Sequence, residues 1–224
     1  MRKIILILPI LLLASCQNNI LTNIAKTDID IVTEIHARNA KEYIEELVIK
    51  LYKINPVYIQ NNKEFNNVSE VIIDIFKDVN KNKIDKTGKE NIDFILKGFS
   101  DEFDGDRIYY ITKGLFGMIN ASYNYKKKFY ITDKILNSQK LMNTSTNIKT
   151  LVWRLSNTKG KNNVILIKTN NIANNNINLS FERLFGKLIN NQENMAMIIS
   201  SQEGRIIHEA AKGIVSSIFL PIGF

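Results

Sequence analysis

Four carboxylates lie close together in the middle of the chain, at Asp101, Glu102, Asp104 and Asp106. Clustered carboxylate oxygens can hold a divalent cation or supply a general acid and base. The same residues also come just before a predicted helix, where negative charge is favoured at the positive end of the helix dipole. We favour this helix-start interpretation and keep Asp101, Asp104 and Asp106 as candidates for metal binding.

A second acidic motif has the spacing of a calcium loop at its beginning only. Asp78, Asn80 and Asn82 match the first three oxygen ligands of an EF-hand. Lys83 stands where that loop requires Gly, and Lys89 stands where it requires the bidentate Glu. The segment therefore predicts a solvated surface turn.

The remaining chemistry-bearing residues do not form a recognisable catalytic motif. His36 and His208 each fall on a predicted helix, without a second His or a Cys nearby in the sequence. No nucleophile elbow, phosphate-binding loop, dinucleotide glycine pattern or zinc-protease motif is present. The sequence does not favour an enzyme, and we expect no cofactor.

Two segments could contact a surface outside the chain. The first is Lys126, Lys127 and Lys128, which are flanked by tyrosines and could meet anionic headgroups, although a solvated loop is the favoured interpretation. The second is residues 214–224, which carry no charged side chain and include Phe219 and Phe224. Burial in the core is favoured for this second segment, and docking to a membrane or a partner is the alternative.

The N-terminus has the parts of a secretory signal. Arg2 and Lys3 precede a short apolar run at residues 4–13, which is about half the roughly 20 residues needed to span a bilayer. Residues 13–16 follow as Leu-Ala-Ser-Cys and resemble the lipobox of bacterial prolipoproteins. The resemblance implies cleavage before Cys16 and acylation of that residue, with the membrane as a partner through the acyl chains.

These features divide the chain into a signal peptide at 1–15, a lipidated tether at 16–27 and a helical domain at 28–224. Cys16 is the single cysteine, so we expect a fold held by core packing without disulfides. Gln17, rather than Asp, follows it, which favours the outer over the inner membrane in enterobacteria-like sorting. The formal charge is +8, but an exported protein rarely meets chromosomal DNA, so we expect no nucleic-acid partner.

Apolar residues at helical spacing predict a mainly α fold, a single bundle of about seven helices with a minor β element. The β element would come from 128–131 and 164–167, as a small hairpin or as packed extended segments, and 170–178 is expected to be an exposed loop. Gly114, Gly117 and Ala121 form a row of small residues that would let another helix approach closely. The predicted helices are 31–54, 68–79, 89–99, 107–123, 138–155, 181–199 and 203–219.

The second half of the chain, residues 107–220, resembles uncharacterised lipoproteins of Gram-negative proteobacteria. The resemblance is carried by the segments 179–189 (LSFERLFGKLI), 195–199 (MAMII) and 214–221 (IVSSIFLP). It implies an envelope lipoprotein and assigns no activity. The expected function is a non-enzymatic, lipid-anchored scaffold or interaction module, for which an envelope protein is a candidate partner. The alternative is a periplasm-facing ligand- or metal-binding domain, or an enzyme, using the acidic cluster.

Overall fold

The computed structural model describes residues 26–77, 88–161, 163–169, 171–173, 176–204 and 218–222. Within these residues the protein is mainly α-helical, as the sequence predicts. The elements are α3 (Asp28–Ile54), α4 (Val57–Gln60), α5 (Val68–Ile75), α6 (Lys89–Phe99), α7 (Arg107–Ser122), α8 (Ser138–Asn157), β1 (Asn171–Ala173), β2 (Asn176–Asn178) and α9 (Ser180–Glu203).

Each predicted helix up to residue 199 has a counterpart close to its expected position. The largest differences are four residues each. α5 ends at Ile75, four residues earlier than expected, because Phe76 leaves the helical conformation. α9 ends at Glu203, four residues later than expected. The single-turn helix α4 was not predicted, since four residues are too few to show a periodic pattern. The helix expected at 203–219 falls mostly outside the described residues.

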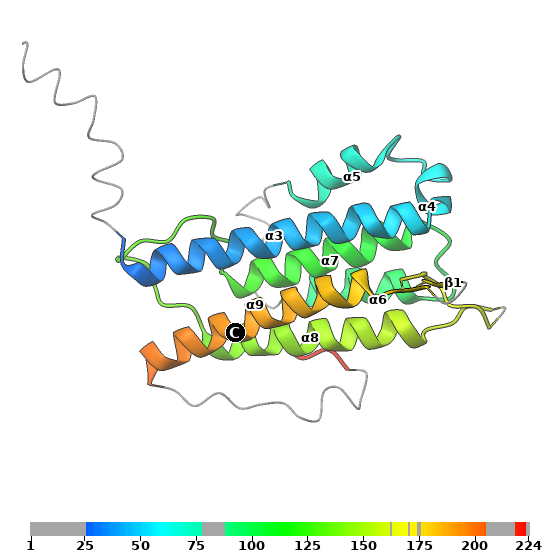
Figure 1. The fold of residues 1–224 in the computed structure, drawn as a ribbon. Helices are drawn as coiled ribbons and strands as arrows, with labels where there is room; N and C mark the ends of the chain where they lie inside the picture. Colours follow the sequence, from blue (N-terminus) through cyan, green and yellow to red (C-terminus); the bar gives the residue numbers. More distant parts are fainter. Residues whose placement is uncertain are drawn as a thin grey trace, which may run out of the picture.

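The long helices pack side by side through apolar stripes. In α3, Ile44, Leu47, Val48 and Leu51 recur at helical spacing and are almost completely buried. Contacts join α3 to α7 and α9, and join α8 to both of those helices, as the ribbon in Figure 1 shows. This shared apolar interior, with no disulfide available, is the main source of stability.

Helix α6 lies unusually close to α7 along the predicted row of small residues. A Cβ added at Gly114 would lie 2.4 Å from the backbone oxygen of Asn91, and one added at Gly117 would lie 2.0 Å from its Oδ1. Neither distance is sterically possible. Gly114 is therefore required where α6 crosses α7, because its clash is with backbone, whereas a side chain at position 117 would force the Asn91 amide to move.

The strands fall where a loop was expected. β1 and β2 pair antiparallel, with Ile172 opposite Ile177. Residues 128–131 and 164–167 form no ladder with each other in the described part of the chain. They run instead as extended or turn segments, with one isolated bridge between Lys159 and Ile165.

The molecule has two distinct ends, separated by the length of α3. Its 27 residues correspond to about 40 Å at the helical rise per residue. The Lys26 end consists of the start of α3, the α7–α8 loop at 123–137 and the last turn of α9, all at the left of Figure 1. The Asp106 end consists of residues 55–65, 98–106 and 158–168.

Candidate functional site

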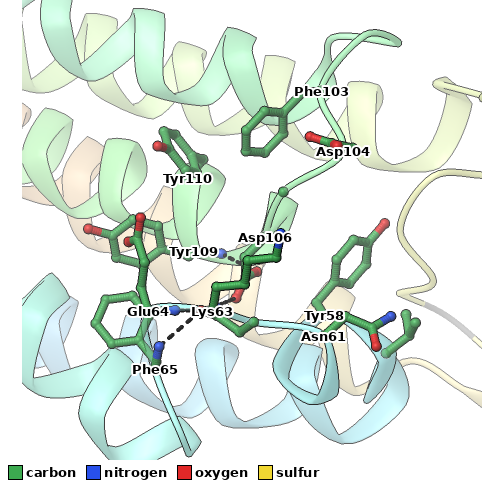
Figure 2. A pocket seen from close by; sticks show the side chains of 13 residues that line it. Tyr58, Asn61, Lys63, Glu64, Phe65, Phe103, Asp104, Asp106, Tyr109 and Tyr110 are labelled. Atoms are coloured by element: carbon green, nitrogen blue, oxygen red, sulfur yellow. Dashed lines mark hydrogen bonds between the residues drawn. The ribbon is translucent and has the colours of Figure 1, made fainter.

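A cleft of about 430 Å³ opens at the Asp106 end. Figure 2 shows it between two segments, 57–65 on one side and 103–110 on the other. Its polar lining consists of amide, carboxylate and ammonium groups, some from exposed loop residues and some from the half-buried Asn62 and Asp106. Its apolar lining is mostly aromatic and comes from Tyr58, Phe65, Phe103, Tyr109 and Tyr110.

Asp106 joins the two sides of the cleft. It is the N-cap of α7, where its Oδ1 accepts the backbone N–H of Tyr109 at 3.0 Å. Its Oδ2 accepts the hydroxyl of Tyr52 and the side-chain amide of Asn62, each at 2.7 Å. Burial raises the pKa of the Asp106 carboxyl, because the cost of desolvating its charge exceeds the effect of these hydrogen bonds.

A second carboxylate nearby behaves in the opposite way. Asp74 of α5 accepts the Tyr109 hydroxyl at 2.7 Å and pairs with the Lys113 ammonium at 2.8 Å. Burial alone would raise the pKa of Asp74, but the hydrogen bonds from Lys113 and Tyr109 outweigh it and the pKa is lowered. The difference from Asp106 is the neighbouring cation, which favours the ionised form.

The loop that forms one wall of the cleft is held by Arg107. This side chain is 8% exposed and donates to the carbonyl of Gly98 at 2.9 Å, to that of Ser100 at 2.7 Å and to that of Phe103. One guanidinium therefore satisfies three carbonyls at the C-terminal end of α6 and in the loop beyond it. The position of Phe103 in the cleft depends on this contact.

The third segment of the Asp106 end is attached to the corner between α3 and α4. Asn55 exchanges two hydrogen bonds with the backbone of Lys168, each at 2.9 Å. The Tyr58 hydroxyl donates to the carbonyl of Leu166 at 2.8 Å. The ring of Tyr58 is thereby fixed in the cleft lining.

The structure places the predicted acidic residues in different environments. Asp101 and Glu102 are exposed, Asp104 lines the cleft, and Asp106 caps α7 with both oxygens engaged. Within the described ranges, no three His, Cys, Asp or Glu side chains come together in a way that could hold a metal ion. Asp106 is the member of this group that caps α7, at the positive end of the helix dipole.

The lysine motif is divided between structural and exposed positions. The Lys126 ammonium pairs with Asp133, and this hydrogen bond lowers the pKa of the Asp133 carboxyl. Lys127 and Lys128 are exposed on the same loop.

The apolar segment before the C-terminus lies against α8. The amide of Asn147 exchanges hydrogen bonds of 2.9 and 2.6 Å with the backbone of Leu220. Phe219 is half-buried, 5.4 Å from the Arg154 guanidinium, and Ile222 is buried. Described residues of this segment therefore pack on the body of the protein.

His36 has a structural environment. Its Nδ1 lies 3.1 Å from the carbonyl of Asn191, and the Asn191 amide donates to the carbonyl of His36 at 2.9 Å. These contacts join α3 to α9. Cys16, Phe224, His208 and the segment 78–82 lie outside the described residues.

Sequence reasoning missed most of the residues that form the site. Tyr52, Asn62 and Asp74 are each more than thirty residues from their partners in α7 or at its cap. Each looks ordinary in its own helix or loop. A capping signal identifies Asp106, but no local pattern indicates which distant donors reach it.

Comparisons with protein-family models, with curated proteins and with solved structures found no match for this chain.

Chemically, the cleft offers ring faces and hydrogen-bonding groups. Burial and the adjacent carboxylates raise the pKa of Tyr52 and of Tyr109, so both phenols remain protonated donors at neutral pH. Their hydroxyls and both Asp106 oxygens are already used within the protein. What remains for a ligand is the aromatic lining together with the exposed Asn61, Lys63, Glu64 and Asp104.

Proposed function

We propose that the protein is an envelope lipoprotein, held at a membrane by acyl chains on Cys16. Its body, residues 28–224, would then act as one helical bundle with a small β element and serve as a non-enzymatic interaction module. The observation that carries the proposal is the Leu-Ala-Ser-Cys motif directly after a charged start and a short apolar run.

The described part of the chain is consistent with an anchor of this kind. α3 begins at Asp28, shortly after the proposed tether, and its first turn is closed by a capping box between Thr27 and Asp30. None of the described helices combines the length and the apolar character needed to cross a bilayer.

The substitution Cys16→Ser tests the anchor. It removes the acylated sulfur, so the protein should leave the membrane fraction in a cell that processes lipoproteins. The matched control is Asn18→Ser, a similar change outside the lipobox, which should leave membrane partitioning intact. Unchanged partitioning of the Cys16→Ser protein would contradict the proposal.

The identity of residue 17 tests the proposed outer-membrane location. In a host with enterobacteria-like sorting, Gln17→Asp should move the protein to the inner membrane, and Gln17→Ser should not. Fractionation of the two membranes would measure this. Equal distribution of both variants would remove the basis for an outer-membrane assignment.

A second candidate function is ligand binding in the cleft, favoured by its aromatic lining and its volume of about 430 Å³. Ring faces beside amides and carboxylates suit a ligand with a flat apolar face and hydroxyl edges, as a sugar has. A panel of neutral oligosaccharides tested by thermal shift would measure this. A shift that Asp104→Asn removes and Asp101→Asn keeps would support the cleft, whereas no shift with any sugar would remove this candidate.

A further inference from the structure

The α7–α8 loop presents exposed aliphatic and basic side chains together at the Lys26 end. Ile131 is 65% exposed and Ile135 is 54% exposed. Lys127, Lys128 and Lys134 are exposed on the same loop. Isoleucines at this level of exposure, beside lysines, make the kind of surface that binds at a membrane interface.

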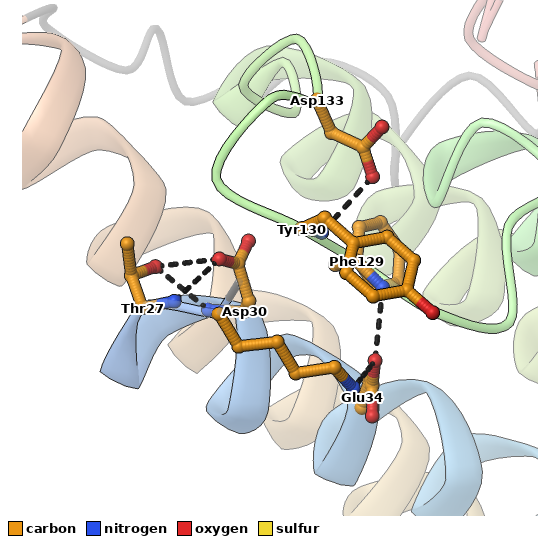
Figure 3. Close-up of polar contacts among 7 residues, drawn as sticks. Thr27, Asp30, Glu34, Phe129, Tyr130 and Asp133 are labelled. Carbon is orange, nitrogen blue, oxygen red and sulfur yellow. Dashed lines mark hydrogen bonds and ion pairs between the residues drawn. The ribbon is translucent and has the colours of Figure 1, made fainter. Parts of the chain in front are cut away.

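The loop has a fixed shape, so the outward direction of these side chains is set by the fold. Phe129 is buried, and its backbone N–H donates to Glu34 of α3 at 2.9 Å. The backbone N–H of Tyr130 donates to Asp133 at 3.1 Å. Figure 3 shows the first of these contacts joining the loop to α3 and the second within the loop. Leu136 is also buried, so the loop is anchored on both sides of Ile131 and Ile135.

Acidic groups around the loop are engaged in contacts of their own. Asp133 pairs with Lys126 and Glu34 pairs with Lys26. Asp30 accepts from Thr27 in the capping box. The charged side chains that residues 127–135 expose are the lysines Lys127, Lys128 and Lys134.

The proposed anchor lies close to this loop. The Lys26 ammonium lies 5.3 Å from the centre of the Tyr130 ring. Nine residues lie between Cys16 and Lys26, and the ten residue-to-residue steps reach no further than about 36 Å even when fully extended. A bilayer that holds Cys16 must therefore lie within about this distance of Lys26 and of the loop beside it. The loop would then experience a high effective concentration of lipid.

We infer that residues 127–135 rest on an anionic phospholipid surface when the protein is anchored. Ile131 and Ile135 enter the interface, and Lys127, Lys128 and Lys134 lie near lipid phosphates. This inference rests on the proposed lipid anchor and adds an orientation to it. Each lysine contributes roughly fivefold to the binding of the loop, and salt weakens this contribution.

The experiment uses the mature lipidated protein in vesicles of phosphatidylglycerol and phosphatidylcholine at a ratio of 1:3 or of phosphatidylcholine alone. With Cys16 acylated, Ile131→Cys supplies one free thiol for an environment-sensitive fluorophore. Ile73→Cys is the matched control, because Ile73 is 70% exposed on α5, away from the loop. Quenching by spin-labelled lipid should be severalfold stronger at position 131 than at position 73, and stronger in the anionic vesicles.

Charge variants complete the test. Replacing Lys127, Lys128 and Lys134 together by Gln should reduce quenching at position 131. The same change at Lys53, Lys63 and Lys161, which are exposed at the Asp106 end, should leave it unchanged. Equal quenching at positions 131 and 73 in protein that has entered the vesicles would overturn the inference alone. The inference would also be overturned if the quenching did not depend on lipid charge and an added acidic protein abolished it. Failure to enter the vesicles at all would overturn the lipid anchor and the inference together.

Discussion

The two ends of the molecule use charged residues in opposite ways. At the Lys26 end, lysines and isoleucines are exposed on a loop whose buried residues hold it to α3. At the Asp106 end, a carboxylate and a guanidinium are drawn inward and surrounded by hydrogen-bond partners and aromatic rings. The first arrangement suits contact with a surface, and the second maintains the shape of a cleft. The difference shows that charged side chains are exposed to the surroundings at one end and stabilise the folded structure at the other.

The largest effect is expected from removing the Arg107 guanidinium. Arg107→Ala leaves three carbonyls around residues 98–103 without their donor, which should lower the free energy of unfolding by about 4 kcal/mol. Chemical denaturation would measure it. Arg38→Ala is the control, because Arg38 is exposed and only 3.9 Å from Glu42 in a surface pair, and it should cost less than about 0.5 kcal/mol. If the two substitutions lowered the free energy of unfolding equally, burial of the cation would not explain the effect of Arg107→Ala.

Asp106→Ala should have the next largest effect. It removes the cap of α7 and leaves the Tyr52 hydroxyl and the Asn62 amide without an acceptor, so we expect a loss of about 3 kcal/mol. The pKa of the Asp106 carboxyl is higher in the folded protein than in the unfolded chain. Its contribution to the free energy of unfolding is therefore complete below the unfolded pKa, and it is lost as pH rises through the folded pKa. The stability difference between wild type and variant should therefore shrink with rising pH. A difference that grows with pH would contradict this assignment.

Lys140, beside the α7–α8 loop, should respond in the opposite direction. It is 5% exposed, and burial, with a smaller contribution from Lys134, lowers its pKa to about 8. Its contribution to stability is therefore complete above the unfolded pKa and is lost as pH falls through about 8. Lys140→Met should stabilise the protein by about 2 kcal/mol at pH 7, measured by denaturant titration. This gain should vanish above about pH 10.5, and a gain independent of pH would point to packing alone.

The smallest effect is expected at the exposed cap of α3. Thr27→Ala removes the capping box with Asp30 and should cost about 1 kcal/mol, whereas Thr27→Ser should be nearly neutral. Thermal unfolding of the two variants would measure the difference. A cost equal to that of Asp106→Ala would show that burial does not distinguish the two caps.

Local sequence signals account for most of the helices and for little of the cleft. The bounds of α6 and the start of α7 follow from the periodicity of apolar residues, and Asp106 caps α7 at the helix start that the sequence indicates. These features depend on neighbours within one turn. By contrast, the N-cap of α6 is Gly88, which has a positive φ of 70° and provides no capping side chain.

The contacts that build the cleft depend on the tertiary fold. Tyr52 meets Asp106 across 54 residues, and Tyr109 meets Asp74 across 35. Burial raises the pKa of Asp106, whereas the hydrogen bonds from Lys113 and Tyr109, both on another helix from Asp74, outweigh burial and lower the pKa of Asp74. No spacing rule within a single helix contains this information.

We propose that a lipid on Cys16 holds one end of this helical body at a membrane. Mass spectrometry of the N-terminal peptide, from protein isolated from its own envelope, tests this anchor most directly. We expect a mature chain that begins at Cys16, lacks residues 1–15 and carries the mass of a diacylglyceryl group on the sulfur. An intact residue 1–15 segment, or an unmodified Cys16 thiol, would contradict it.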